Sequence, residues 1–399
     1  MRFLHTSDWH LGRALHGTNL IEDQAHLLEQ IVGLVKRSDI EAVLVAGDVF
    51  DRAVPPVEAV ALLNQTFNDL VLDLGLPVIV VAGNHDGPVR LSFGSRLLER
   101  QNLHMVGALS GAAVPILLED AHGPVSVLAV PYTEPAAARD AFGSEAILDH
   151  DSAARVALTR LREALPELAA ARVGSGRPAG PRSILVTHAF VTGALESESE
   201  RPLSLGGAGK VDASALEGFS YVALGHLHRP QAAGKESIRY SGSLFPYAFS
   251  EGEKSVTLVD LRADGTVALE PVALEPRRHV RKVAALMEEL LRGPEGVPLP
   301  PGAAPVSRED YIWVDLLDPG PIYDAIGRLR EVFPNVLHLN RPLLEDGRAR
   351  VPAPDHRQVT DGDLFQAFFR DTVGQELTTE EQDAFATVVD DLRQKEREE

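Results

Sequence analysis

Six short runs rich in Val, Ile and Leu constrain the fold of this chain more than any other feature of its sequence. The runs do not alternate apolar with polar residues, which is typical of strands buried on both faces of a sheet. Stretches between the first three runs place apolar residues three and four positions apart, as amphipathic helices do. The order strand, helix, strand, helix, strand predicts a layered α/β fold. The runs span 2–6, 42–46, 78–82, 125–130, 183–187 and 221–224, and the helical patterns span 24–35 and 55–70.

The remaining chain predicts a second sheet, a small cap and two terminal helices. From Ile238 onward, short strands at 255–260 and 265–269 predict a second sheet that closes the first domain. A basic cluster at 277–282 is followed by a helix-like stretch to Leu291, and then by a strand at 311–316, a helix at 321–332 and a strand at 335–339. We expect a first domain at 1–275, an α+β cap at 276–340, a linker at 341–360 and a helical pair at 361–399.

Composition limits the chemistry that the chain can perform. Because the sequence contains no cysteine, any metal must be held by nitrogen and oxygen ligands. The 38 Lys and Arg residues stand against 58 Asp and Glu residues, and the net charge of -20 is unsuited to holding nucleic acid by phosphate neutralisation alone. A nucleic-acid substrate would therefore require bound cations and a partner to supply positive charge. No apolar stretch is long enough for a signal peptide or a membrane span, so we expect a cytoplasmic protein.

Side chains with metal-binding chemistry follow five of the predicted strands. Because ligands collect beyond the carboxyl ends of strands in an open α/β sheet, we expect the five segments to deliver these side chains to one place. In extended chain, side chains two positions apart point to one side, which predicts Asp8 with His10 and His226 with His228 as ligand pairs. The set is too large for one ion, so two ions ~3.5–4 Å apart are predicted, with Asp48 able to bridge them. The candidate ligands are Asp8, His10, Asp48, Asn84, His188, His226 and His228.

The types of donor atom limit which metals can bind, and the adjacent residues Asn84 and His85 are predicted to have different roles. Mixed imidazole and carboxylate ligation favours manganese, iron or zinc over magnesium. Asn84 and His85 are adjacent and should diverge, so that one binds metal while the other reaches substrate. A lone histidine after a strand is usually a satisfied turn residue, and only the joint pattern favours a metal site. We expect His5 to be packed within its strand, and the histidines outside the motifs, among them His16 and His338, to be structural.

Candidate nucleic-acid contacts are few. Arg90 and Arg96 follow the third strand and are candidate DNA-facing residues, with Arg13 and Arg201 as weaker candidates. The basic cluster at 277–282 is expected to be ordinary surface. No aromatic stripe suggests base stacking, so recognition is expected through backbone and shape.

Taken together, these motifs resemble the calcineurin-like metallophosphoesterase superfamily. They occur in that family's order, as Asp8-x-His10, Gly47-Asp48-x-x-Asp51, Gly83-Asn84-His85-Asp86, His188 and Gly225-His226-x-His228. Within the superfamily, the segments 7–12, 47–51 and 197–203 closely resemble the SbcD family of bacterial nuclease subunits. The resemblance implies a four-layer sandwich of two mixed β-sheets flanked by helices, with a small α+β cap and C-terminal helices. It also implies a manganese-dependent double-strand exonuclease and single-strand endonuclease that processes DNA ends and hairpins in repair, recombination and replication.

The resemblance assigns roles to individual residues. Residues that match Asp8, His10, Asp48 and His228 hold one manganese in that family, and residues that match Asp48, Asn84, His188 and His226 hold the second. His85 would contact the scissile phosphate and help the 3′-oxygen to leave. Asp51 stands where archaeal and eukaryotic relatives carry a histidine, and we expect it to hydrogen-bond a metal ligand.

A separate ATPase chain is expected. No G-x-x-x-x-G-K-[ST] motif occurs, since Gly209-Lys210 is followed by Val211 and Gly234-Lys235 by Glu236. The resemblance identifies the ATPase as SbcC-like, with two copies bound to two copies of this chain, which would itself form a homodimer.

We expect the helical pair at 361–399 to dock on that partner. Residues 361–399 carry 12 Asp and Glu against 4 Lys and Arg, a net charge of -8 that suits a basic groove. Gly374 ends the first helix, and Thr378-x-x-Glu381 is a capping box for the second. The alternative is a helical hairpin folded onto its own domain. The docking residues are predicted to be Leu364, Phe365, Phe368, Phe369, Phe385, Val388, Val389 and Leu392.

Two other functions compete with a DNA nuclease. A small-molecule phosphodiesterase or phosphomonoesterase would use the same metal ligands but would not need the cap and terminal helices. A non-catalytic adaptor would be expected to have lost ligands, whereas all seven are present. Cleavage of a chromogenic phosphate ester without cleavage of DNA would favour the first alternative.

Overall fold

The computed structural model describes residues 1–109, 115–172, 182–200, 209–300 and 302–345, and within 365–388 it describes positions 365, 366, 369, 377–379, 381, 382, 384, 385 and 388. The chain forms two compact units, one of residues 1–316 with 323–340 and one of residues 317–322 with 341–399. The structure in the following paragraphs belongs to the first unit unless the second is named.

The first sheet has six strands in the order β16-β15-β1-β4-β5-β6. Its strands β1, β4, β5 and β6 are parallel, and the continuous buried apolar runs of β4 and β5 are typical of such strands. Helices α1 (Ile21–Arg37) and α2 (Val57–Phe67) bury their apolar stripes against its outer face. The strands are β1 (Arg2–Thr6), β4 (Ala42–Ala46), β5 (Val78–Val81), β6 (Leu103–Val106), β15 (Lys254–Leu261) and β16 (Val267–Leu274).

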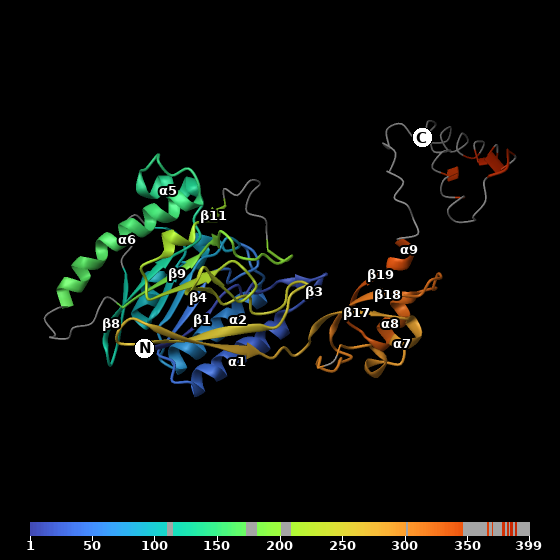
Figure 1. Ribbon diagram of the computed structural model, residues 1–399, viewed down its shortest axis with the longest axis horizontal. Coiled ribbons are helices and arrows are strands. Elements are labelled where there is room, and N and C mark those ends of the chain that lie inside the picture. The colour runs from blue at the N-terminus through green and yellow to red at the C-terminus, as the bar shows by residue number, and fades with distance from the viewer. Residues whose placement is uncertain are drawn as a thin grey trace. The chain divides into compact units, whose positions relative to one another are not determined.

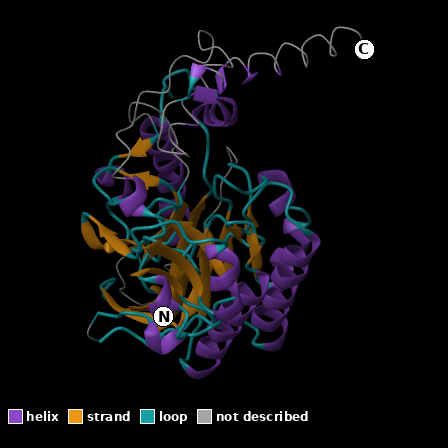
Figure 2. Ribbon diagram, turned by 90° about the vertical axis from the view of Figure 1, so that its right-hand side faces the viewer, coloured by secondary structure: helices purple, strands orange, loops and turns teal. Residues whose placement is uncertain are grey.

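The second sheet also has six strands, in the order β13-β14-β12-β9-β8-β7. Helices α5 (Pro135–Phe142) and α6 (His150–Arg172) lie on its side of the molecule, opposite α1 and α2 (Figure 1). Strand residues such as Ile79 and Val186 meet in a core between the two sheets, so the predicted order of helices, sheet, sheet, helices is confirmed (Figure 2). The strands are β7 (Ile116–Asp120), β8 (Gly123–Val130), β9 (Ser183–His188), β12 (Tyr221–Gly225), β13 (Gln231–Ala233) and β14 (Lys235–Tyr240).

The expectation that residues 255–269 form the second sheet is wrong. Strand β15 pairs antiparallel with β1, with Phe3 opposite Val259, and β16 continues outward from β15. Both strands therefore widen the first sheet, and the second sheet is made by strands between β7 and β14. Backbone pairing decides sheet membership, and a change of composition along the chain does not report it.

The cap is a three-stranded parallel sheet with two helices, α7 (Met287–Leu290) and α8 (Ala325–Val332). The helix-like stretch expected between the basic cluster and Leu291 is confirmed in part, because α7 covers residues 287–290, whereas residues 283–285 belong to strand β17. Only Val283 and Ala285 of that strand are fully buried, a period of two that matches a strand packed on one face. Helix α8 begins at Ala325, four residues after the expected start. The strands are β17 (Val280–Ala285), β18 (Tyr311–Leu316) and β19 (Val336–Asn340).

The first unit also contains several short strands and short α-helices. They are β2 (Ala14–Leu15), β3 (Thr18–Asn19), α3 (Pro88–Leu91), α4 (Ser95–Leu98), β10 (Phe190–Val191) and β11 (Lys210–Val211). Within the described ranges, no helix is both long enough and apolar enough to cross a membrane.

The second unit contains α9 (Pro342–Glu345) and the described part of the C-terminal helices. The capping box is confirmed, since Glu381 Oε2 accepts the Thr378 backbone N–H at 2.8 Å and Thr378 Oγ1 accepts the Glu381 N–H at 3.3 Å. The rings of Phe365 and Phe385 stack with centroids 3.9 Å apart. Leu364, Phe368, Gly374, Val389 and Leu392, and most of the expected linker, lie outside the described residues.

Candidate metal centre

The loops that follow β1, β4 and β5 of the first sheet meet the loops that follow β9 and β12 of the second. Six of the predicted ligands are buried, and Asn84 is partly buried. Groups of acidic and imidazole side chains form there within 4.8 Å of one another. These groups are Asp8, His10 and His228; Asp8, Asp48 and His188; and His10, Asp51 and His85.

The backbone at this centre is not extended, so the prediction from strand alternation was wrong even though the side chains do meet. Asp8, His10 and Asp48 have φ values of 51°, 44° and 48°, and His226 has 112°. Such conformations cost of order 1–3 kcal/mol each and persist where surrounding structure enforces them. Here the loops after β1 and β4 are joined by backbone hydrogen bonds. The Asp8 N–H donates to Gly47 O at 3.0 Å, and the His10 N–H donates to Asp48 O at 2.9 Å.

Two glycines let these loops approach each other. A Cβ on Gly83 would lie 2.1 Å from Asp48 Oδ1, and a Cβ on Gly47 would lie 2.3 Å from His188 Nδ1. Gly47 also has a φ of 89°, which other residues rarely adopt. The glycines thus make room for side chains of the centre.

His10 and His228 face each other through their Nε2 atoms, 3.0 Å apart. Burial lowers the pKa of His228 to about 4, and burial with neighbouring imidazoles lowers the pKa of His10 well below its usual value, so both rings are neutral near pH 7. Ser199 Oγ donates to the Glu251 carboxylate and must therefore accept from His228 Nδ1–H, at 2.5 Å. The lone pair of His228 Nε2 consequently points into the centre, as a metal ligand requires.

The His188 ring is also held by a hydrogen bond so that its Nε2 faces the centre. Its Nδ1–H donates to Ala46 O at 2.9 Å, and burial lowers its pKa to about 4. The unprotonated Nε2 then faces Asn84 Oδ1 at 2.9 Å and Asp48 Oδ2 at 3.6 Å. Asn84 Oδ1 also lies 3.0 Å from His226 Nδ1. At the contact between His188 Nε2 and Asn84 Oδ1, two acceptor atoms converge without a proton between them, which fits a cation.

Asp48 belongs to both sides of the centre. Its Oδ2 lies 3.6 Å from Nε2 of His10 and 3.6 Å from Nε2 of His188, while its Oδ1 accepts the His85 backbone N–H at 2.8 Å. Burial raises the pKa of Asp48 to about 6, and burial and the Asp48 charge raise the pKa of Asp8 well above its usual value. Two buried carboxylates whose charged forms are disfavoured need positive charge nearby. The buried His and Asp clusters are thus consistent with a dinuclear metal site.

Asn84 and His85 diverge, with His85 turned toward the loop that contains Asp51. Its Nδ1–H donates to Asp51 O at 2.8 Å, which leaves Nε2 facing the centre, 3.9 Å from Asp48 Oδ2. The carboxylate of Asp51 lies 3.6 Å from Nδ1 of His10 and 3.7 Å from Nε of Arg13. His10 Nδ1 has no hydrogen bond among the described residues.

Three groups that support the ligands were not predicted from the sequence. The Asp86 carboxylate accepts N–H groups from Gly83, Val49 and Phe50 at 2.9–3.1 Å and so ties two ligand loops together. Gln24 of α1 donates to His10 O at 2.8 Å and to the Tyr247 hydroxyl at 2.9 Å. Glu251 is paired with His228 and with the buried Lys254. Asp86 lay inside a quoted motif, whereas the others carried no signal beyond burial.

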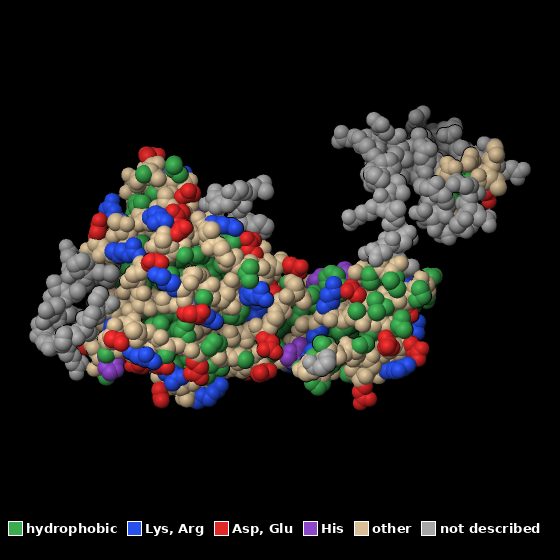
Figure 3. Space-filling model, in the orientation of Figure 1, with side chains coloured by type: hydrophobic (Ala, Val, Ile, Leu, Met, Phe, Trp, Pro, Cys, Tyr) green, Lys and Arg blue, Asp and Glu red, His purple; other side chains and the backbone are tan. Residues whose placement is uncertain are grey.

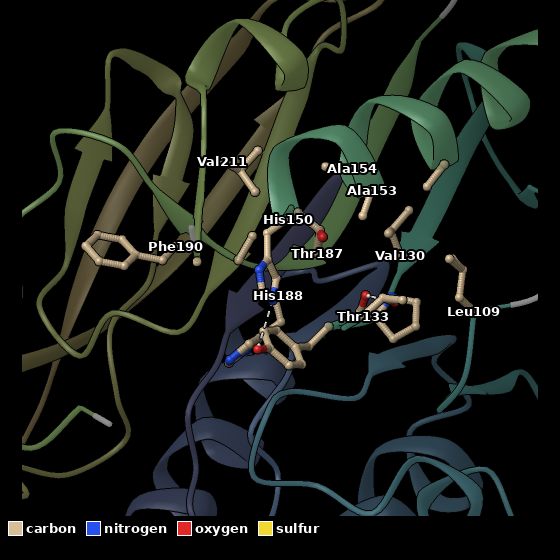
Figure 4. Close-up of a pocket in the computed structure, with 15 residues that line it drawn as sticks. Leu109, Val130, Thr133, His150, Ala153, Ala154, Thr187, His188, Phe190 and Val211 are labelled. Atoms are coloured by element: carbon tan, nitrogen blue, oxygen red, sulfur yellow. Dashed lines mark hydrogen bonds between the residues drawn. The ribbon is translucent and has the colours of Figure 1, made fainter. Parts of the chain in front are cut away.

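An apolar pocket adjoins His188 (Figure 4). It is lined by ends of β8 and β9 and by the first turns of α6, and His150 hydrogen-bonds the Tyr132 hydroxyl at 3.1 Å across it. The ring centroids of Tyr132 and His188 are 6.2 Å apart. His150 was expected to have no chemical role. It contacts Tyr132, whose ring in turn lies near the predicted ligand His188.

The remaining predicted residues lie in varied surroundings. Arg13 lies beside the centre and donates to Ser199 O at 2.8 Å, while Arg90 and Arg96 are exposed on α3 and α4. Arg201 lies outside the described residues. His5 is packed as expected, between the Tyr221 hydroxyl and Leu224 O, and burial lowers its pKa to about 3.

The basic cluster at 277–282 is largely engaged in ion pairs. Arg277 and Arg278 pair with acidic residues of α1, and Arg281 and Lys282 pair with acidic residues of the cap. The cluster is thus an ordinary paired surface, as expected.

Comparison with known proteins gives consistent matches. Residues 1–230 match the family of calcineurin-like phosphoesterases, and residues 276–373 match SbcD_C, described as the type 5 capsule protein repressor C-terminal domain. A Staphylococcus saprophyticus protein, named as the SbcD subunit of nuclease SbcCD, is 28% identical over 382 residues, covering 95% of both chains. Its Staphylococcus epidermidis namesake is 27% identical over 385 residues, covering 96% of both. The crystal structure of TT1561 of Thermus thermophilus is 18% identical, covers 69% of this chain and 99% of its own, and has a TM-score of 0.40.

Proposed function

The chain belongs to the calcineurin-like phosphoesterases, in their SbcD branch, and is a metal-dependent hydrolase; from this premise we propose that it hydrolyses DNA phosphodiester bonds with two divalent ions. The observation that carries the two-ion mechanism is the position of Asp48 Oδ2, equidistant at 3.6 Å from ring nitrogens of His10 and His188. A carboxylate shared between two imidazole groups suits a bridge between paired ions.

The donor sets support one assignment of ligands. Asp8, His10 and His228 would hold one ion, Asn84, His188 and His226 the other, and Asp48 both. When bound, such ions activate water and neutralise charge on the phosphate. Manganese suits this mixture of imidazole and carboxylate ligands.

His85 would act on the substrate. When the ring is protonated at both nitrogens, Nδ1–H is held by Asp51 O and Nε2–H is free to donate to a phosphate oxygen or to the leaving 3′-oxygen. The Asp51 carboxylate, near both His10 and Arg13, would orient the metal ligand. Arg13, Arg90, Arg96 and Arg201 would contact the DNA backbone.

We propose exonuclease action on double-strand ends and endonuclease action on single strands, in the cytoplasm, during DNA repair and recombination. A manganese-dependent assay on linear duplex and single-stranded DNA, run beside a chromogenic bis-phosphate ester, tests this. Hydrolysis of DNA supports the proposal. Ester hydrolysis without DNA cleavage, with or without the partner, would return the chain to the small-molecule phosphodiesterases, and no hydrolysis of either would favour an adaptor.

The C-terminal helices would dock an SbcC-type ATPase. Phe365, Phe369 and Phe385 remain only partly buried, and Val388 is 56% exposed. The Phe365–Phe385 stack joins the two described helical segments, so their partly buried apolar side chains would dock as one pair.

A second copy of the chain would cover an apolar surface on α2, α3 and α4. Val57, Val89, Phe93 and Leu97 are each more than 70% exposed, and Arg90 ties α3 to the loop before α2 by donating to Ala53 O at 2.9 Å. Exposed apolar groups on neighbouring elements are typical of a protein interface. We therefore propose a homodimer that binds two copies of the ATPase. The mass of the purified chain in solution, with Phe93→Asp as the disrupting variant, tests it.

A further inference from the structure

Four aromatic rings from separate parts of the sequence meet where the first domain joins the cap. Trp313 of β18 lies against His338 of β19 with ring centroids 3.7 Å apart, against Phe249 at 5.6 Å and against His16 at 6.0 Å. The rings of His16 and His338 are 5.8 Å apart. Figure 3 shows histidine side chains at this junction beside basic ones. We call these four residues the aromatic cluster.

The Trp313 ring is held in a fixed orientation. Its Nε1–H donates to Asp315 Oδ1 at 2.9 Å, and Asn340 donates to the same oxygen at 3.1 Å. Lys282 Nζ lies 3.1 Å from Asp315 Oδ2 and 5.2 Å from the centroid of the Trp313 ring. The polar edge of the indole is satisfied, and its ring packs against His338 and lies beneath Lys282, so the surfaces left for a ligand are the solvent-exposed parts of the four rings.

The cluster is open to solvent. His16 is exposed, and the other three rings are only partly buried. His16 occupies the tip of the β2–β3 hairpin with a φ of 47°, followed by Gly17 with 84°, a turn that places two residues in the left-handed region. A non-glycine residue there is uncommon, and such strain concentrates at functional positions.

Two short segments connect the cluster to the metal centre. His10 and His16 are six residues apart, so their Cα atoms are separated by at most about 21 Å. The Tyr247 ring packs 5.4 Å from the His10 ring, and Phe249 follows Tyr247 by two residues. A DNA strand that enters the centre can therefore reach the cluster within a few nucleotides.

We propose that the aromatic cluster is a stacking site for an unpaired nucleobase of a single-stranded or hairpin DNA substrate. The inference rests on the proposed function, and it adds the part of the DNA substrate that the aromatic cluster would bind, an unpaired base. Stacking is available to any base, because every base has a π-face, and it requires no positive charge. That property suits a chain with a net charge of -20, in which Lys282 beside the cluster is already paired with Asp315.

Tryptophan fluorescence tests the proposal directly, since the chain has two tryptophans and Trp9 is fully buried. The full-length protein in EDTA, which prevents cleavage, is titrated with a single-stranded oligonucleotide and with an abasic oligonucleotide of equal length and charge. We expect the normal strand to quench Trp313 emission and to bind at least about tenfold more tightly than the abasic strand. The Trp313→Phe variant, which retains a ring for packing, should lose the quenching.

Variants separate stacking from a merely structural role. His338→Ala should reduce the preference for the normal strand over the abasic strand, with an unchanged melting temperature, whereas the control Tyr323→Ala, at a cap residue that is 94% exposed, should not. Equal binding of both strands, or quenching that survives Trp313→Phe, would overturn the stacking site. Neither result depends on hydrolysis, so loss of the proposed nuclease activity would be recognised separately, by the manganese-dependent cleavage assay.

Discussion

Glu251 Oε1 lies 3.5 Å from Nδ1 of His228, and the Ser199 hydroxyl joins the two groups by hydrogen bonds. The opposite carboxylate oxygen accepts from Lys254 Nζ at 2.6 Å. Burial alone would raise the pKa of Glu251, but its interactions with His228 and with the Lys254 charge hold it at about 2. An ionised carboxylate thus fixes the tautomer of His228 from outside the metal centre.

Glu251→Gln should weaken metal binding without removing a ligand. Replacement of the carboxylate lowers the basicity of His228, and such outer partners typically contribute about 10- to 100-fold in metal affinity or activity. Manganese titration of activity should show the loss and its recovery at high manganese. The exposed neighbour Glu253 supplies the control Glu253→Gln, and an unchanged manganese dependence in Glu251→Gln would contradict the role.

Asp48→Asn should abolish hydrolysis. The variant removes the negative charge shared between the two imidazole groups, so the loss should exceed the roughly 100-fold effect typical of outer partners. Isothermal titration with manganese should show fewer than two sites, while circular dichroism stays native. The exposed Asp140 of α5 provides the control Asp140→Asn, and two intact sites with normal turnover in Asp48→Asn would refute the shared-ligand assignment.

His85→Leu should keep metal and DNA binding but lose cleavage by about 100- to 10,000-fold, the usual contribution of general acid–base catalysis. The residue offers its backbone N–H to Asp48, which the substitution retains. Manganese titration and turnover, measured on one preparation, check the retained metal binding and the loss of cleavage. His122→Leu, on the exposed β7–β8 turn, is the control, and loss of bound metal in His85→Leu would show that His85 is itself a ligand.

Deletion of residues 361–399 should leave a manganese-dependent nuclease that does not co-purify with its ATPase partner and has lost stimulation by ATP. The first unit is compact without these residues, so the truncated protein should keep its fold. Phe368→Asp with Phe369→Asp should act like the deletion, whereas the exposed Thr379→Asp should not. Undiminished partner binding by the truncated chain would favour a hairpin that packs on its own domain.

The contribution of Asp120 to the free energy of unfolding should fall at low pH. Burial would raise its pKa, but the bidentate Arg182 guanidinium, at 2.7 and 2.6 Å, and the Met1 amine outweigh burial and hold the pKa below its usual range. A carboxyl whose pKa is lower in the folded state stabilises the fold above its unfolded pKa of about 3.9 and loses that contribution as pH falls further. Urea unfolding between pH 7 and pH 3 should therefore show a steeper loss for the wild type than for Asp120→Asn, with Asp73→Asn as the exposed control. Parallel curves would contradict this.

The sequence by itself determined most of the buried strands and which side chains are candidate ligands. Strands β1 and β4 begin and end at the predicted residues because their uninterrupted apolar runs can be satisfied only inside a sheet. The candidate ligands Asp8, Asp48 and His188 follow strand ends, where the polypeptide must turn, so their convergence could be predicted from position alone. The capping box of Thr378 and Glu381 joins residues three positions apart, so it too could be predicted from the sequence.

Only the tertiary structure decided how these parts face one another. Backbone pairing placed β15 beside β1, and left-handed φ values, which a period-two argument cannot anticipate, aimed Asp8 and His10. Which nitrogen of His228 faces the centre depends on Glu251, which is distant in sequence. The aromatic cluster joins His16 to His338 across more than 300 residues. Such contacts join residues far apart along the chain, and no local pattern encodes them, because each side chain alone has an ordinary structural role that only its neighbours in space can change.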